Sequence, residues 1–346
     1  MGKPVKYLAA ILVALFLISC DEDASHVLPR YSGAPGELLV IIPDALYESR
    51  PGDILYDHFA AYQPMLPQAE PFFNLVHMSP EKVNNITRQH RNLLFVNIKP
   101  NSEETPRVEA QRNKWASEQL VVNVYAPSID VFDSLMAENG SALLEKYNEY
   151  ERKRLKGNFT FRKNHTIADD LLAKEGLSLT VPRDCRIARQ EKNFVWIERK
   201  REKPSGGSLH DVLQGVLVYH YPYTADTSFT AGHVLAVRDS VLRQYVPGPV
   251  EGSYMTTEYL VEPAYRVVEH NGAYAVEMRG LWKVAQGAPM GGPFISLTVH
   301  DEARGRIVTA EGFVFAPKFS KREYLREVEA MIYSIEWPKG EDSEES

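Results

Sequence analysis

The segment around Asn271-Gly272 most constrains the fold, because it fixes two neighbouring strands as antiparallel. It joins the strand-like stretches YRVVEH and AYAVEMRGLWKV. Asn-Gly between two alternating stretches is the strongest short signal for a two-residue hairpin. In the second stretch the apolar side chains fall on one face, and Glu277, Arg279 and Lys283 fall on the other. This alternation predicts a half-buried antiparallel strand whose charged face meets solvent.

The rest of the second half adds more strands and two helices. A second hairpin is expected where FISLTVH (294–300) and RIVTAEGFVF (306–315) flank a short turn. Apolar residues at three- and four-residue steps predict helices at residues 232–246 and from about Ser320. Further strands are predicted at LSLTVP, FVWIERK and GVLVYHYPY, and a loop is predicted at EKPSGGS.

The first half alternates strand-like and helix-like segments. Strands are predicted at residues 37–43, 72–78, 92–98 and 120–126, and helices at 51–62, at 80–90 and from Ser128. The last of these helices carries an apolar stripe that a sheet must cover, unless Asn139-Gly140-Ser141 interrupts it.

These patterns together predict an α+β fold. We expect an N-terminal α/β unit at residues 37–155, followed by a mainly antiparallel sheet unit at residues 156–338 that a C-terminal helix closes. One continuous sheet through both units is the alternative.

Residues 1–19 have the features of an export signal. Lys3 and Lys6 precede an uncharged stretch from Tyr7 to Ile18. That stretch is shorter than the ~20 apolar residues that a membrane-spanning helix needs. We therefore interpret residues 1–19 as a signal peptide.

The signal ends in LISC (17–20), which resembles the lipobox of bacterial lipoproteins, where the cysteine is lipidated. An ordinary secretory signal with a chance cysteine is the alternative. Lipidation at Cys20 would hold the mature chain on a membrane, since two or more acyl chains give stable anchoring. Residues 20–36 are then an acidic flexible tether. Its DED (21–23) also resembles the acidic tract of Bacteroidetes lipoproteins that reach the cell surface. We expect a lipid anchor in the outer membrane, with the protein facing the periplasm or the surface.

The charge excludes one class of partner. Without Lys3 and Lys6 the 39 basic residues fall to 37, against 46 acidic ones. Such an acidic protein has no electrostatic attraction for a phosphate backbone, so a nucleic-acid partner is not expected. The basic cluster RKRLK (152–156) ends a helical pattern, where a solvated helix end is the expected setting. Residues 339–346 are expected to form a disordered acidic tail.

Two cysteines occur in the whole chain. Lipidation of Cys20 would leave Cys185 without a partner, so the fold must stand without a disulfide bond. A reactive thiol needs a basic or helix-N-terminal setting that the sequence does not show. Cys185 is therefore expected to be a small buried apolar residue.

The standard catalytic motifs are absent. The sequence contains no G-x-S-x-G, H-E-x-x-H, P-loop, G-x-G-x-x-G or C-x-x-C. His210, His220 and His233, with Asp211 and Asp226, come nearest to a metal-binding set, but their spacing does not specify the convergent ligands that zinc requires. We predict no catalytic residue, no metal and no cofactor, and whether the chain is an enzyme stays open.

Two features favour binding. Tyr219, Tyr221 and Tyr223 alternate along one strand and share one face of it. Aromatic rings with a polar group suit glycan, peptide or protein surfaces, although the same residues could instead cover a helix.

The second feature is the loop QGAPMGGPF (286–294), which contains Met290, Gly291 and Gly292. Adjacent glycines let the backbone approach a ligand closely, and a tight structural turn explains them equally well.

One family resemblance rests on four segments: PMLPQAEPFFNLVHM (64–78), RNLLFVNI (91–98), APMGGPF (288–294) and AEGFVFAPKFSKREYL (310–325). They are similar to an uncharacterised family of Bacteroidetes lipoproteins, known only as a domain of unknown function. The resemblance implies a membrane-anchored envelope protein and supplies no site residues. The second half is also similar to PsbP-like domains, which mostly act as non-enzymatic accessory modules, through LSLTVP, a Trp-containing strand and a final helix.

The sequence therefore predicts a lipid-anchored envelope protein with a non-catalytic binding or accessory role towards protein or glycan. The alternative is an envelope hydrolase whose acid-base residues are not recognisable from sequence. The patterns leave open the ligand, the oligomeric state and the side of the outer membrane.

Overall fold

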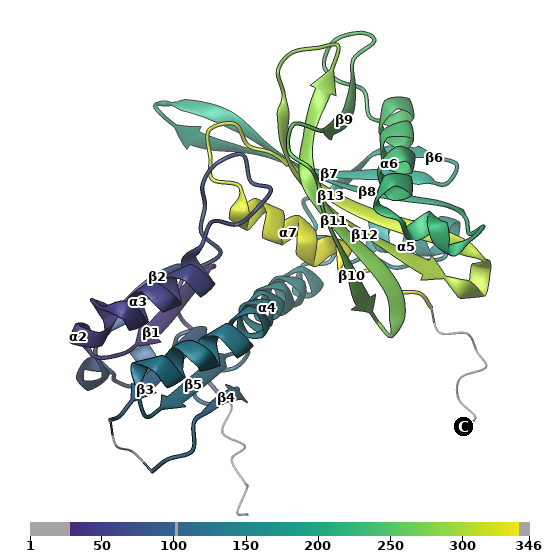
Figure 1. The fold of residues 1–346 in the computed structure, drawn as a ribbon. Helices are drawn as coiled ribbons and strands as arrows, with labels where there is room; N and C mark the ends of the chain where they lie inside the picture. Colours follow the sequence, from purple (N-terminus) through teal and green to yellow (C-terminus); the bar gives the residue numbers. More distant parts are fainter. Residues whose placement is uncertain (1–27, 101–102, 339–346) are drawn as a thin grey trace, which may run out of the picture.

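The computed structural model describes residues 28–100 and 103–338, and Cys20, the expected signal peptide and the acidic tail lie outside them. The described chain forms two separate sheets, one of five strands and one of eight, each with its own helices (Figure 1). The predicted α+β class is confirmed: an α/β unit comes first and a curled antiparallel sheet with a C-terminal helix follows.

The N-terminal sheet has the strand order β2-β1-β3-β5-β4 and is parallel except for β4. Its strands are β1 (Glu37–Ile41), β2 (Asn74–Met78), β3 (Asn92–Ile98), β4 (Arg107–Arg112) and β5 (Leu120–Ala126). The central strands are continuous apolar runs because both of their faces are covered, as in most parallel sheets. β4 was not predicted, because Val108 and Ala110 are the only apolar residues of this short, mostly polar segment.

Short helices precede one long helix in this domain. They are α2 (Asp44–Tyr47), α3 (Arg50–Leu55), a π-helical turn (Tyr56–Ala60) and two 3-10 turns (Pro80–Lys82, Thr87–Gln89) that replace the predicted helix at residues 80–90. The long helix is α4 (Ile129–Phe161), capped by the hydroxyl of Ser128, which accepts a hydrogen bond from the N–H of Val131.

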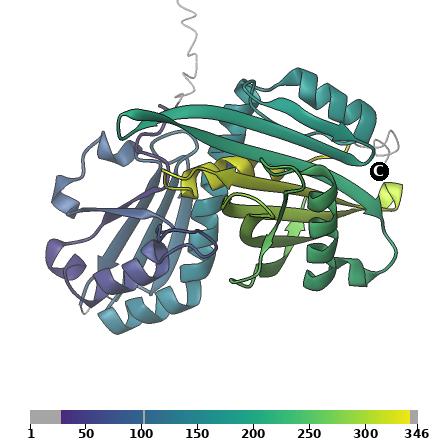
Figure 2. The same ribbon diagram turned by 90° about the horizontal axis from the view of Figure 1, so that it is seen from above.

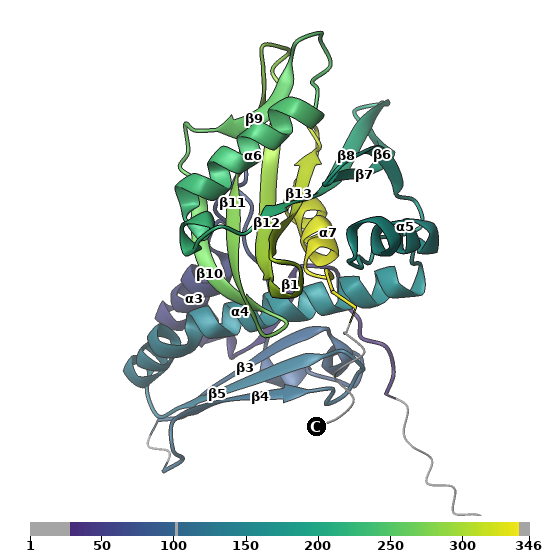
Figure 3. The same ribbon diagram turned by 90° about the vertical axis from the view of Figure 1, so that its right-hand side faces the viewer.

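Helix α4 is not interrupted at residues 139–141. Gly140 packs so closely on the ring of His58 that a Cβ there would lie 2.3 Å from Nδ1, which explains a glycine in mid-helix. At ~1.5 Å per residue the helix is about 50 Å long. Residues from Phe132 to Tyr150 pack on the N-terminal sheet, whereas Phe159 near the end of the helix belongs to the core of the second domain. Figure 3 shows α4 lying between the two domains.

The C-terminal sheet has the order β10-β11-β12-β13-β8-β7-β6, and β9 pairs with the end of β11. Its strands are β6 (Arg186–Glu191), β7 (Phe194–Ser205), β8 (Ser208–Pro222), β9 (Tyr254–Glu258), β10 (Ala264–His270), β11 (Ala273–Ala285), β12 (Gly291–Asp301) and β13 (Arg306–Phe315). The helices are α5 (His165–Glu175), α6 (Ala231–Tyr245) and α7 (Arg322–Ile332), with 3-10 turns at Asp226–Phe229 and Glu302–Arg304.

Both predicted hairpins form. Asn271 and Gly272 have φ of 52° and 80°, the left-handed conformation that a two-residue turn of this kind requires. β12 and β13 pair in register around residues 301–306.

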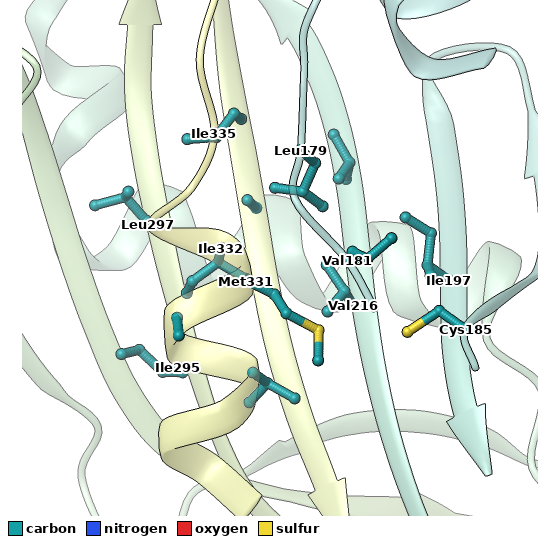
Figure 4. Close-up of a cluster of buried hydrophobic side chains, with 14 of the residues drawn as sticks. Leu179, Val181, Cys185, Ile197, Val216, Ile295, Leu297, Met331, Ile332 and Ile335 are labelled. Atoms are coloured by element: carbon teal, nitrogen blue, oxygen red, sulfur yellow. The ribbon is translucent and has the colours of Figure 1, made fainter. Parts of the chain in front are cut away.

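Helices cover both faces of the C-terminal sheet. α5 and α7 pack on one face, where Met331 and Ile332 meet Ile295 of β12 (Figure 4). α6 packs on the other face, in a cluster rich in aromatic side chains. The prediction of a solvent-facing side for β11 is therefore wrong, because α7 and α4 cover that side and Glu277 is 1% exposed.

Two other predictions for the second half need correction. LSLTVP (177–182) is not a strand but a buried segment with single bridges, such as Ser178 with Glu336. Its Leu177 and Leu179 fill the core between the sheet and α7, here called the α7-side core. The predicted loop at residues 202–208 is only a Gly206-Gly207 turn, since β7 and β8 continue through it as one long hairpin (Figure 2).

Candidate binding cleft between the domains

Residues 61–73, here called the arm, connect the π-helical turn to β2 and reach the second domain. Leu66 of the arm packs against the α7-side core. Gln68 accepts a hydrogen bond from Nζ of Lys321 at 2.7 Å. The arm therefore ties the first domain to the segment that opens α7.

Glu70 of the arm caps α7 from the other domain. The first N–H groups of a helix have no partner within it, and negative charge is favourable there. The Glu70 carboxylate accepts from the N–H groups of Lys321, at 2.6 Å, and Arg322, at 3.0 Å. The side chains of Arg322 and Arg326 donate in turn to arm carbonyls at 2.6 Å. The start of α7 is thus fixed to the N-terminal domain by charge-assisted bonds in both directions.

Six side chains of alternating sign form a closed charged ring beside this contact. In order around the ring they are Glu145, Arg152, Glu329, Arg279, Glu277 and Arg266. Each arginine bonds to the glutamate on either side of it, at N–O distances between 2.6 and 3.3 Å. Two members come from α4, one from α7, two from β11 and one from β10. The charged ring therefore bridges the two domains.

The ring keeps its buried carboxylates ionised. Burial acts to raise the pKa of Glu277, but Arg279 and Arg266 outweigh it and hold that pKa far below the usual range. At Glu329 burial also acts to raise the pKa, but Arg279 and Arg152 outweigh it, so the pKa of that carboxyl is lowered too. The hydroxyl of Tyr333 donates to Glu277 as well. Neither carboxylate can serve as a proton donor near neutral pH, because both are held in the charged form.

A cleft of about 330 Å³ opens over the charged ring. This is within the size range of small-ligand sites, which lies at ~300–1,000 Å³. All six ring residues line it, and so does Arg326. Its other walls are largely apolar and come from three elements: Pro64, Met65 and Phe72 of the arm, Leu144 of α4 and Tyr265 of β10. The cleft thus offers an apolar surface next to paired charges.

The three tyrosines of β8 do not form an open surface. Tyr219 is 3% exposed and packs in the α6-side core, with Tyr221 and Tyr223 at its edge. The Tyr223 hydroxyl donates to Asp226 at 2.6 Å, and the buried Tyr221 hydroxyl finds no partner among the described residues. Burial by α6 matches the helix-covering alternative, and Tyr219 cannot touch a partner in this conformation.

Residues 286–294, here called the Gly/Pro loop, line a shallow groove of about 560 Å³ together with Pro67 of the arm. A Cβ on Gly292 would lie 2.0 Å from the carbonyl oxygen of Val314, and one on Gly291 would lie 2.6 Å from that of Trp282. Close packing of neighbouring strands therefore accounts for both glycines. Met290 is half-buried beside the α6-side core. A ligand at Met290, Gly291 and Gly292 stays a prediction.

The cysteine and the histidines considered from the sequence are held by ordinary structural contacts. Burial raises the pKa of the Cys185 thiol to about 12, so the thiolate is scarce at neutral pH. His210 bonds to the carbonyl of Ser205, and His220 bonds to Glu175. No group of three or more His, Cys, Asp or Glu placed to hold a metal occurs among the described residues. Nor does any helix in that part of the chain have the length and apolarity needed to span a bilayer.

Sequence reasoning missed the charged ring, although weak signals existed. Glu145 and Arg152 are seven residues apart and so share one face of α4. Arg152 and Arg154 were expected at a solvated helix end, which is wrong: Arg154 is fully buried against Glu151, and Arg152 lies in the ring. The sequence could not show that the second domain covers Arg152, or that carbonyls of Arg91 and Glu118 in the first domain enclose Arg154.

Two protein-family models together match nearly all of the described residues. Residues 164–334 match Domain of unknown function (DUF4837), and residues 32–160 match Domain of unknown function (DUF8532). Each half of the chain thus matches a family known only as a domain of unknown function. The expected likeness to such a family is confirmed. The likenesses to Bacteroidetes lipoproteins and to PsbP-like domains stay predictions.

No curated protein matches the two-domain chain. Among solved structures, the Ran-binding protein Mog1p of Saccharomyces cerevisiae is 10% identical, with a TM-score of 0.30, over 47% of this chain and 90% of that one. LpqN, which is involved in cell envelope biogenesis of Mycobacterium tuberculosis, is 15% identical, with a TM-score of 0.25, over 47% of this chain and 83% of that one.

Proposed function

We propose that this two-domain protein is a lipid-anchored envelope protein with a non-catalytic binding or accessory role, and that it binds a segment of a partner protein in the interdomain cleft. The observation that carries the proposal is the cleft itself. It is built by both domains, and its apolar walls stand beside a ring of paired arginines and glutamates.

The chemistry of the cleft favours a peptide over a glycan. The walls combine the aliphatic side chains of Pro64, Met65 and Leu144 with the rings of Phe72 and Tyr265. A mixed aliphatic and aromatic wall suits the varied side chains of a peptide, whereas sugar rings are usually held on aromatic faces alone. An apolar side chain fits between the arm and α4, and the polar backbone around it can bond to Glu145 or Arg266 at the rim. Both of these ring members are partly exposed.

The anchor is supported by the sequence motif that ends at Cys20. Mass spectrometry of the protein isolated from membranes tests it directly. We expect an N-terminus at Cys20 carrying diacylglyceryl and acyl groups. An unmodified thiol there, or a start upstream of it, would contradict the anchor. Protease treatment of whole cells then reports which side of the outer membrane the protein faces.

The hydrolase alternative gains no specific support from the cleft. A glutamate that acts as a general acid needs a raised pKa, and the arginines beside Glu277 and Glu329 lower the pKa of both carboxyl groups.

Filling the cleft tests the binding proposal. Ser141 is exposed and lines the cleft, whereas the neighbouring Ala142 is exposed on α4 but outside the lining. We expect Ser141→Trp to abolish recovery of the partner after crosslinking in living cells, because the indole occupies the space. Ala142→Trp is the matched control and should recover the partner as the unchanged protein does. Equal recovery with both variants would contradict a partner site in the cleft.

A further inference from the structure

The described chain begins on one defined face of the N-terminal domain. The carbonyl of Pro29 accepts from the N–H of Ser117 at 2.8 Å, and Arg30 donates to Asn158 near the end of α4 at 3.2 Å. The next residues run beside residues 89–91. Figure 3 shows the start of the chain beside this end of α4. The contacts fix where any tether from Cys20 must arrive.

Two large apolar side chains are exposed on this face. Phe161 is 83% exposed and stands one helical turn after Asn158, on the same side of α4. Ile86 is 75% exposed and precedes the segment that pairs with residue 32. Neither side chain belongs to a core cluster.

Cations stand in the same chain segments as these two side chains: Arg162 directly follows Phe161, and Arg88 lies two residues after Ile86. Arg88 and Lys114 both lie over the ring of Trp115, at 5.6 and 4.5 Å from its centroid. We call the whole surface the entry face; its residues are Arg30, Ile86, Arg88, Arg112, Lys114, Trp115, Phe161 and Arg162. The half-buried Glu118 is the acidic residue among these segments. This face is basic on a chain whose net charge is −7.

The tether limits how far the entry face can move from a lipid anchor. Seven residues lie between Cys20 and Leu28, the first described residue, so eight Cα–Cα steps join the two. At ~3.6 Å per extended residue they span at most about 30 Å. If the anchor proposed above is present, the basic and apolar face is held within that distance of the bilayer.

We propose that the entry face rests on an anionic phospholipid surface, with Phe161 and Ile86 inserted among the headgroups and the surrounding cations at the phosphates. This inference rests on the proposed anchor. Cationic side chains around protruding apolar ones are the composition that binds such surfaces, through electrostatic attraction and burial of apolar area. The short tether supplies the proximity.

Photo-crosslinking from position 161 tests the proposal. The protein is prepared from Cys20 onward, which keeps every described residue, and is coupled through the Cys20 thiol to a maleimide lipid. Cys185 is buried and does not compete. Vesicles contain phosphatidylethanolamine with phosphatidylglycerol, and benzoylphenylalanine replaces Phe161. The control carries the same group in place of Leu209, which is 64% exposed. Leu209 lies in the β7–β8 hairpin, and Figures 1 and 3 show this hairpin far from the start of the described chain.

We expect lipid adducts from position 161 and none above background from position 209. Lys114→Gln should lower the adduct yield from position 161 roughly fivefold, since the loss of a single charge near an anionic surface matters by about that factor. Lack of an adduct at position 161 would overturn the proposal, and so would an adduct with a second copy of the chain in place of lipid.

Chemical coupling makes this test independent of native lipidation. Adducts from position 161 together with an unmodified native Cys20 would refute the proposed anchor and leave the lipid-binding face standing. A lipidated native Cys20 without adducts from position 161 would support the proposed anchor and refute the lipid-binding face.

Discussion

At the scale of single residues, the most unusual feature is an ion pair buried beneath α6. Arg238 and Glu311 are both fully buried and form two bonds, at 2.8 and 2.7 Å. Arg238 also bonds to the hydroxyl of Thr257 at 2.7 Å and stacks on the ring of Phe294. A buried pair gains less than its geometry suggests, because both charges lose their hydration.

This pair gives the first stability prediction. Arg238→Met and Glu311→Leu should each lower the free energy of unfolding by about 3–5 kcal/mol, because each leaves one buried charge without its partner. The double variant should be more stable than either single variant. Urea unfolding with a comparison of midpoints and slopes measures all three. If the two losses simply add, the partners are not coupled and the buried pair does not form.

At the scale of elements, the arm and α7 depend on each other. α7 carries no side-chain cap of its own, and Glu70 supplies one from the other domain. The segments around the arm, the Gly/Pro loop and the start of α7 are far apart in sequence, yet they meet here: Gln68 bonds to Lys321, and Pro67 lines the groove beside Met290.

Removing the cap should weaken the docking of the arm. We expect Glu70→Ala to lower the free energy of unfolding by about 2 kcal/mol, because two N–H groups at a helix start lose a charged acceptor. Hydrogen exchange should speed up in the first turn of α7. Glu81→Ala, at an exposed site of the same domain, is the control and should change little. Unchanged exchange at the start of α7 in Glu70→Ala would show that the cap is not formed.

At the scale of the whole molecule, the charged ring joins the two domains and makes their contact depend on pH. Glu277 and Glu329 have lowered pKa values in the folded protein, so the unfolded chain binds more protons as the pH falls. Their contribution to stability is complete above the ordinary glutamate pKa of about 4.3 and is lost progressively below it.

Acid titration of stability tests the ring. The urea midpoint should be flat from about pH 7 to about pH 5 and should fall from there towards about pH 3, as the lowered pKa values require. Glu277→Gln should lower the midpoint at neutral pH and make the fall with acid shallower, because one of the two linked groups is gone. A variant whose acid dependence is as steep as that of the unchanged protein would contradict a lowered pKa at Glu277.

Sequence patterns predicted the elements that local chemistry specifies. The Asn271-Gly272 hairpin, α6 and α7 follow from turn stereochemistry and apolar spacing, which act within a few residues. The patterns failed where partners are distant. β4 is an edge strand with only Val108 and Ala110 as apolar residues, which is too weak a pattern to predict a strand. Gly140 suggested a break because its contact with His58 lies 82 residues away in sequence.

The sequence by itself determined the fold class, the two hairpins, the division into an α/β half and an antiparallel half, and the expectation of a lipid anchor. All of these depend on short-range preferences or on a contiguous motif. The cleft was decided only by tertiary structure. Its ring takes residues from α4, β10, β11 and α7, and each of these looks like an ordinary surface charge in its own segment. Charges become a site only when folding removes water from around them and sets opposite signs within bonding distance, and no local pattern records that event.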